Sequence, residues 1–84
     1  MIEPGQIEAD VLAFLRREVF APEMKVDADT DLVAAGFDSM SLVRLLLFIE
    51  TQYQLWIPEG EITGDMLLNA RSVTAAVSRL LHEK

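Results

Sequence analysis

Residues 36–53 read GFDSMSLVRLLLFIETQY, and their apolar pattern decides the fold. Large apolar side chains and one tyrosine recur along one side at helical spacing: Leu42, Leu45, Leu46, Ile49 and Tyr53. This spacing predicts a helix that begins at Asp38 or Ser39, ends near Tyr53 and packs this stripe against the core.

A second apolar stripe lies on a different side of the same helix and consists of Met40, Val43 and Leu47. Two interpretations remain open: the fold encloses both sides, or the second stripe is a docking surface for another protein. A chain of 84 residues has few other elements to cover both sides. Docking is therefore the favoured interpretation.

The residues before this stretch predict one more helix and a loop. Helical spacing indicates a first helix from about Pro4 or Gly5 to Glu18, and its apolar positions are Ile7, Val11, Leu12, Phe14, Leu15 and Val19. Residues 23–31 are polar and follow a proline, which indicates a loop. Three apolar residues after this loop are expected to fold back onto the core: Leu32, Val33 and Phe37.

The C-terminal third predicts a loop, one short helix and one long helix. Residues 56–60 are predicted to be loop, because proline disfavours helix in the residue before it. Thr63 is expected to cap a short turn that runs through Leu67, and Ser72 to cap the last helix. The apolar stripe of that last helix is Val73, Ala76, Val77, Leu80 and Leu81.

The predicted fold class is therefore all-α, a small bundle of three longer helices plus one short helix, with residues 1–84 forming a single domain. The chain has no cysteine, so disulfides, thiolate nucleophiles and thiolate metal sites are excluded. The N-terminus lacks the basic region of a signal peptide, and the longest apolar run, residues 45–49, is too short to span a bilayer. We expect a soluble, cytoplasmic monomer.

The net charge of −7 is unevenly distributed. Residues 1–40 hold nine carboxylates against three basic side chains, whereas residues 41–84 hold five against four. Nucleic acids and anionic membrane surfaces would be repelled by such a chain, and basic protein partners would be attracted. We therefore expect neither nucleic-acid binding nor membrane binding.

The start of the second helix is the candidate functional site. Gly36 suits a turn that requires positive φ. Asp38 is placed to cap the helix, and Ser39 then occupies the first helical position with its hydroxyl outside the bundle. A phosphodiester on that hydroxyl would be stabilised by the positive helix end. On these residues alone, a serine that follows an aspartate at a helix start is most often plain capping.

The surrounding sequence resembles a known family. Residues 29–40, DTDLVAAGFDSM, are similar to the D-x-D-L-x-x-x-G-x-D-S-L/M segment of the acyl and peptidyl carrier protein family. Glu50, Tyr53 and residues 55–58 also fit the family pattern, and the similarity extends from the first helix to Leu81.

This resemblance implies a non-catalytic phosphoprotein. A phosphopantetheinyl transferase would attach 4′-phosphopantetheine from coenzyme A to Ser39, beside the helix cap at Asp38. The thiol of the arm would then carry an acyl or aminoacyl group as a thioester. Further partners would be a loading ligase or acyltransferase and downstream biosynthetic enzymes. The residues expected to dock these partners are Met40, Val43, Arg44, Leu47 and Glu50.

Two features depart from the fatty-acid members of this family. Such carriers usually present several acidic residues along the second helix, whereas only Glu50 remains on its outer side here. Arg44 stands where an acidic residue is common, and partners that recognise a carboxylate would be disfavoured by it. These departures indicate a specialised pathway, such as polyketide, nonribosomal peptide or related biosynthesis.

A calcium loop is a weaker interpretation of the acidic segment. Asp27, Asp29 and Asp31, with Asp38 at the twelfth position, echo the spacing of an EF-hand. Leu32 occupies the sixth position, where the sharp turn requires glycine. We therefore expect no metal site.

The remaining alternatives concern an enzyme or an adaptor. His82 is the only histidine and has no serine or cysteine at a catalytic spacing, so we expect a solvated residue at a helix end and no enzymatic activity. A helical protein–protein adaptor, which binds partners through the second helix alone, remains the main alternative. Modification of Ser39 distinguishes the two classes.

Overall fold

The computed structural model describes residues 2–83, and within this range all regular secondary structure is helical. The elements are the α-helix α1 (Pro4–Phe14), the π-helical turn η1 (Leu15–Val19), the α-helix α2 (Ser39–Tyr53), the short 3₁₀ helix η2 (Glu59–Glu61) and the α-helix α3 (Ala70–Glu83). The predicted all-α fold is confirmed. None of these helices is long and apolar enough to cross a bilayer, as far as residues 2–83 show.

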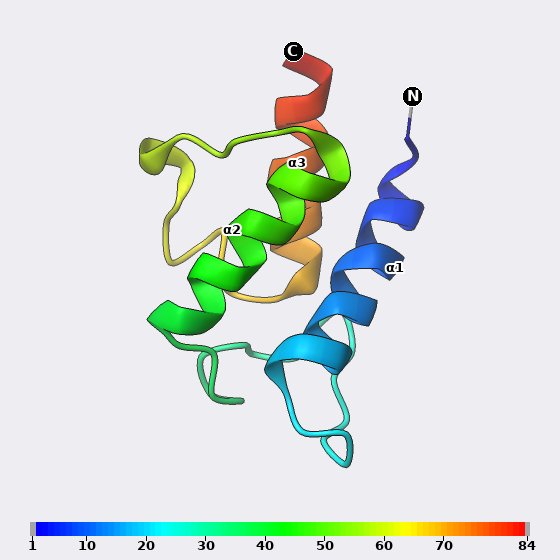
Figure 1. Cartoon of the computed structure of the whole chain (residues 1–84), viewed down its shortest axis with the longest axis vertical. Helices are drawn as coiled ribbons and strands as arrows, with labels where there is room; N and C mark the ends of the chain where they lie inside the picture. Colours follow the sequence, from blue (N-terminus) through cyan, green and yellow to red (C-terminus); the bar gives the residue numbers. More distant parts are fainter. Residues whose placement is uncertain (1, 84) are drawn as a thin grey trace.

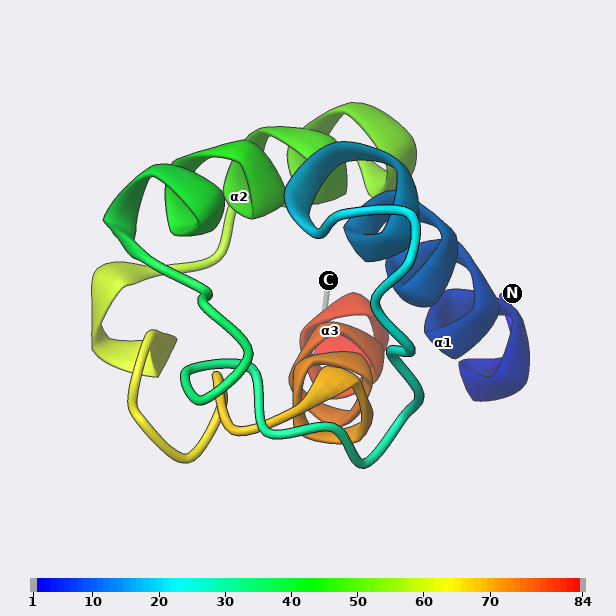
Figure 2. The same ribbon diagram turned by 90° about the horizontal axis from the view of Figure 1, so that it is seen from below.

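The three α-helices surround one hydrophobic core (Figures 1 and 2). α1 packs most closely against α3. Residues 20–38 cross the end of the bundle at which α2 begins, and residues 54–69 lie on the side away from α1. Both connections contribute core residues, so the bundle depends on its loops as well as on its helices.

The core is built from all three helices and both long connections. Its largest fully buried side chains are Ile7, Val11, Leu15, Leu32, Leu45, Ile49, Ile57, Val73 and Val77. Each such burial stabilises the fold by about 1.5–3 kcal/mol relative to an exposed side chain. On α2, Leu45 and Ile49 are fully buried, whereas Leu46 is only half-buried. The predicted stripe therefore does face the core, but only Leu45 and Ile49 are fully buried in it.

The first helix ends in a widened turn. The backbone N–H of Phe20 donates to the carbonyl of Leu15 at 2.9 Å, a π-type bond that spans five residues. This turn carries the helix to Val19, one residue beyond the predicted end, and places Phe20 in the core.

Aromatic side chains join α1 to α2. Phe14 stacks on Phe48 with ring centroids 4.6 Å apart, and Phe48 meets Tyr53 edge-on at 6.3 Å. The hydroxyl of Tyr53 donates to the carboxylate of Asp10 at 2.9 Å. Burial, together with this carboxylate, raises the pKa of Tyr53 above its usual range. Phe48 lies in neither predicted stripe, so its role was not foreseen.

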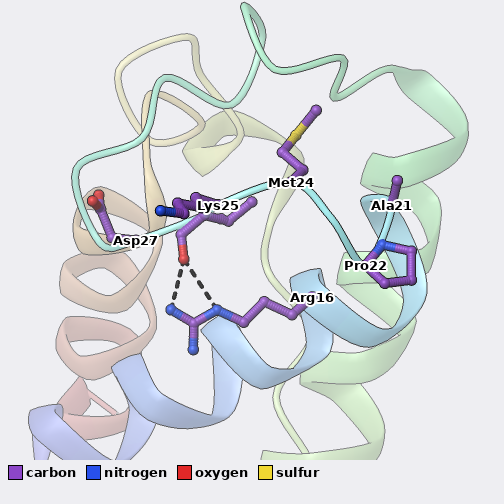
Figure 3. A pocket seen from close by; sticks show the side chains of 7 residues that line it. Arg16, Ala21, Pro22, Met24, Lys25 and Asp27 are labelled. Atoms are coloured by element: carbon purple, nitrogen blue, oxygen red, sulfur yellow. Dashed lines mark hydrogen bonds between the residues drawn. The ribbon is translucent and has the colours of Figure 1, made fainter.

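The loop after η1 is fixed to the first helix by one arginine. The guanidinium of Arg16 donates two hydrogen bonds to the carbonyl of Val26, at 3.0 and 2.6 Å (Figure 3). A hollow of about 430 Å³ lies between this arginine and the loop and is lined by Pro22, Met24 and Lys25 among others.

The same loop is also fixed to the start of α3. Arg71 donates from its backbone to the carbonyl of Ala28 at 3.1 Å and from its guanidinium to Asp29 at 2.9 and 3.1 Å. The hydrogen bond and charge of Arg71 lower the pKa of Asp29. Asp27 and Asp31 instead accept backbone N–H groups within the loop. The three carboxylates at the spacing of a calcium loop therefore each accept hydrogen bonds from different donors.

One residue of this segment does not follow the prediction. Leu32 and Phe37 fold onto the core as expected, but Val33 is 68% exposed. The N–H of Gly36 donates to the carbonyl of Val33 at 3.0 Å, and the N–H of Phe37 to that of Leu32 at 2.9 Å. This tight turn directs Leu32 and Phe37 inward and leaves Val33 in solvent.

The predicted short helix is displaced. The chain forms a 3₁₀ helix at Glu59–Glu61, which overlaps the end of the segment expected to be loop, and only a hydrogen-bonded turn over residues 64–67. Thr63 does cap that turn, since its hydroxyl accepts the N–H of Met66 at 3.1 Å. The capped turn through Leu67 was predicted correctly, whereas the short helix of the bundle lies at Glu59–Glu61 and not at this turn.

The cap of α3 also differs from the prediction. The side-chain oxygen of Asn69 accepts the N–H of Ser72 at 2.8 Å, and the helix begins at Ala70. The hydroxyl of Ser72 accepts the N–H of Asn69 at 3.1 Å and contacts the carbonyl of Met66 at 2.7 Å. Asn69 is thus the capping residue, and Ser72, in the first turn of the helix, accepts a hydrogen bond from the backbone of Asn69 in return.

Candidate functional site

Asp38 caps the N-terminus of α2. Its backbone is extended, and its carboxylate accepts both the N–H and the hydroxyl of Ser41 at 2.9 Å. The pKa of Asp38 is lowered mainly by the hydrogen bond from the Ser41 N–H and, to a smaller extent, by the hydrogen bond from the Ser41 hydroxyl. The predicted cap geometry is therefore present, with an ionised carboxylate at the positive end of the helix.

The turn before the cap depends on Gly36. Its φ of 111° lies in the region that residues with a side chain rarely adopt, as the sequence predicted. No heavy atom lies within 4 Å of the position that a Cβ would take. The requirement for glycine is therefore conformational and does not arise from crowding.

Ser39 is the first residue of α2 and is exposed. Within residues 2–83 its hydroxyl has no hydrogen-bond partner, whereas the hydroxyl of Ser41 is bound to Asp38. The local sequence thus offers two neighbouring hydroxyls and leaves only that of Ser39 available. Ser39 itself does not cap the helix, because Asp38 performs that role.

The surroundings of Ser39 fit a bulky anionic substituent. Ser39 is exposed, and the positive end of α2 lies beside it. A phosphodiester at this position would gain from the helix dipole without burying charge.

The second stripe of α2 forms an exposed face that begins at the same helix end. Met40 is 64%, Val43 50% and Leu47 51% exposed. Arg44 and Glu50 are exposed on the same helix. The structure thus brings the five predicted docking residues onto the outer side of α2, and docking itself stays a prediction.

Arg44 contacts the end of the first helix. One terminal nitrogen of its guanidinium donates to the backbone carbonyl of Glu18 in η1 at 3.0 Å. The arginine therefore leans across the boundary between η1 and α2 and has a defined position on the docking face.

This boundary contains a groove that the sequence did not reveal. The groove has a volume of about 380 Å³ and is lined by Phe14, Arg17, Glu18, Arg44, Leu47, Phe48 and Thr51. It forms where two helices distant in sequence meet, so no local pattern could have found it. The position of Phe48 between the two stripes of α2 was the only available signal.

Of the large apolar residues exposed outside α2, two lie on segments that contact each other. Val33 is 68% and Leu68 52% exposed, and the segments that carry them are joined by the bond from the N–H of Leu32 to the carbonyl of Leu68. Val33 also stands in the turn that leads to Gly36 and so to the site. The sequence had assigned Val33 to the core.

Comparison with known proteins addresses the site directly. The family model described as the phosphopantetheine attachment site matches residues 9–80. Aminoacyl carrier protein 2 of Bradyrhizobium diazoefficiens is 36% identical over 58 residues, which are 69% of this chain and 62% of that protein. The match therefore spans less than two thirds of the relative. Because the family model covers most of the chain, including the capped start of α2, the protein belongs to the family of phosphopantetheine-binding carrier proteins.

Proposed function

We propose that Ser39 is the residue that carries the 4′-phosphopantetheine arm of this protein. One observation carries the proposal: Ser39 alone combines the capped N-terminus of α2 with an exposed hydroxyl that has no partner within residues 2–83. The family match supports the covalent cofactor, and the position of Ser39 within residues 9–80 is consistent with it.

The attachment is a phosphoryl transfer onto the Ser39 hydroxyl. The oxygen of Ser39 forms a bond to the phosphorus of coenzyme A that bears the pantetheine, and the bond to the other phosphate breaks. The adenosine 3′,5′-bisphosphate leaves, and the hydroxyl proton is taken up by a base on the transferase or by water. Attack by the Ser39 oxygen requires that its hydroxyl be accessible and not held in a hydrogen bond, as described above. When bound, the group supplies a terminal thiol that holds a cargo as a thioester.

The cargo is proposed to be an acyl or aminoacyl group of a specialised pathway, such as polyketide, nonribosomal peptide or related biosynthesis. The name of the relative from Bradyrhizobium diazoefficiens favours the aminoacyl alternative. Arg44 on the docking face supports a pathway other than fatty-acid synthesis, because it presents a cation where partners of fatty-acid carriers expect a carboxylate.

The remaining assignments follow from this role. We propose a cytoplasmic monomer whose residues 1–84 act as one carrier domain and catalyse no reaction themselves. Its partners are a phosphopantetheinyl transferase, a loading ligase or acyltransferase and downstream biosynthetic enzymes. Met40, Val43, Arg44, Leu47 and Glu50 are the residues proposed to contact them.

Intact mass spectrometry tests the attachment site. Incubation with a broad-specificity phosphopantetheinyl transferase, coenzyme A and Mg²⁺ should add one phosphopantetheinyl group to the wild type and none to Ser39→Ala. Ser41→Ala is the matched control, since it removes the neighbouring hydroxyl and should still be modified. An unmodified wild type, or a modified Ser39→Ala with native circular dichroism, would contradict the proposal.

A protein–protein adaptor remains a second candidate because α2 exposes an apolar stripe. An adaptor would bind its partner equally well with Ser39 replaced by alanine. A carrier would lose all transfer of cargo on the same replacement.

A further inference from the structure

The groove between η1 and α2 is bordered by a fixed cation. Arg44 donates to the carbonyl of Glu18, which restricts its guanidinium, yet in the described part of the chain it forms no ion pair. Arg17, on the same groove, does pair with the carboxylate of Glu18 at 3.0 Å. The groove therefore carries an uncompensated positive charge on a chain whose net charge is −7.

An apolar stripe of defined length lies next to this cation. Met40, Val43 and Leu47 are separated by three and four residues, and the rise from Met40 to Leu47 is about 10 Å. Leu47 also lines the groove. Two turns of an apolar helix would match this length, so the stripe suits a helical segment better than a small molecule.

The charges that flank the stripe differ in sign. At about 100° per residue, Arg44 and Glu50 fall on opposite sides of the line from Met40 to Leu47. A helix seated on this line would meet a cation along one flank and an anion along the other. The arrangement can therefore select both the charge and the direction of what binds.

We propose that this face binds an amphipathic helix of a partner protein, which presents a carboxylate to Arg44 and seats an apolar side chain in the groove beside Leu47. The inference rests on the proposed function, because a carrier must dock beside Ser39 to exchange its cargo. A guanidinium matches a carboxylate with two parallel hydrogen bonds, and Arg44 is already oriented by Glu18.

The contact at Arg44 attracts an anion, whereas the molecule as a whole is negatively charged and attracts cations. The contact can therefore distinguish one protein partner from another. The acidic remainder of the chain attracts basic partners in general. Among these basic partners, only those that place a carboxylate at Arg44 would fit, because a basic residue facing Arg44 would be repelled. The partner helix is therefore expected to be acidic on the flank that faces the groove.

Two synthetic helical peptides test the proposal. They share one apolar stripe and differ along one flank, which carries glutamate in the first peptide and lysine in the second. The glutamate peptide should shift the backbone amide NMR signals of Leu47, Phe48 and Thr51, whereas the lysine peptide should leave them in place. In Arg44→Gln the affinity for the glutamate peptide should fall by about three- to fivefold.

Matched variants separate this contact from general electrostatics and from misfolding. Arg44→Lys keeps the charge but loses the paired hydrogen bonds of the guanidinium, so its affinity should lie between those of the wild type and Arg44→Gln. Lys25→Gln removes one exposed positive charge away from the groove and should change nothing. Both must keep the circular dichroism of the wild type.

The proposal is overturned if both peptides shift the groove signals equally, if neither does, or if Arg44→Gln binds the glutamate peptide as well as the wild type. The titration is performed on the chain without modification of Ser39, so its outcome does not depend on any transferase. If no transferase modifies the chain, the proposed function is contradicted. If the chain does not distinguish the two peptides, only this inference is contradicted.

Discussion

The carboxylate of Asp38 accepts both the N–H and the hydroxyl of Ser41, each at 2.9 Å. These two bonds close the first turn of α2 and occupy the hydroxyl of Ser41. Ser39, which lies between the two partners in sequence, keeps an exposed hydroxyl. The helix cap and the candidate attachment site are thus parts of one arrangement.

This cap predicts a pH dependence of stability. The pKa of Asp38 is lowered in the fold by its hydrogen bonds from Ser41, so the unfolded chain binds the proton more readily. The stabilisation by the ionised cap is therefore present above the unfolded pKa of about 4 and is lost as pH falls through the folded pKa. The Tm difference between wild type and Asp38→Asn should be largest near neutral pH and should shrink below pH 4. A difference that stays constant over this range would show that the carboxylate charge is irrelevant.

Truncations on α2 should separate its two faces. Leu45→Ala and Ile49→Ala remove fully buried side chains and should each cost about 2–5 kcal/mol of unfolding free energy. Leu46→Ala should cost less because Leu46 is half-buried, and Leu47→Ala should change stability by less than about 1 kcal/mol. Urea denaturation measures all four, and equal losses would refute the assignment of faces.

Gly36→Ala should destabilise the turn before the site. The φ of 111° forces a Cβ into a disfavoured conformation, which costs about 1–2 kcal/mol. Gly5→Ala is the matched control, because Gly5 lies in the first turn of α1 and alanine has the higher helix propensity there. Chemical denaturation should therefore show opposite signs for the two changes, and a neutral Gly36→Ala would rule out the conformational requirement.

Thr74→Val should stabilise the protein. Thr74 is 5% exposed on α3, and within residues 2–83 its hydroxyl oxygen has no hydrogen-bond partner. Replacing a buried, unpaired hydroxyl by a methyl group should raise the unfolding free energy by about 1 kcal/mol. Thr63→Val is the control and should lower it by about 1 kcal/mol, because Thr63 accepts the N–H of Met66. A loss of stability in Thr74→Val would indicate a partner for the hydroxyl, such as a buried water.

Arg44 should restrict exchange with enzymes of fatty-acid synthesis. The wild type is expected to be a poor substrate for them, and Arg44→Glu should raise the loading rate roughly threefold or more at low ionic strength. The gain should shrink as salt is raised, because exposed charges are screened. Lys25→Glu makes the same charge change away from α2 and serves as the control. Efficient loading of the wild type would exclude the specialised-pathway argument from Arg44 and leave the carrier family intact.

The sequence by itself determined the features that depend on neighbouring residues. The span of α2, the exposure of Met40, Val43 and Leu47, the cap at Asp38 and the positive φ of Gly36 were all predicted correctly. Each depends on helical periodicity or on hydrogen bonds between residues at most four positions apart. Such interactions are specified by the residue types of one short segment.

Only the tertiary structure decided the features that depend on segments meeting in space. Val33 faces solvent because the turn that ends at Gly36 is held against the segment of Leu68. The groove and the bond from Arg44 to Glu18 join residues 26 positions apart, where η1 packs against α2. Helix packing depends on how side chains from different elements interdigitate, and periodicity within one helix does not contain that information.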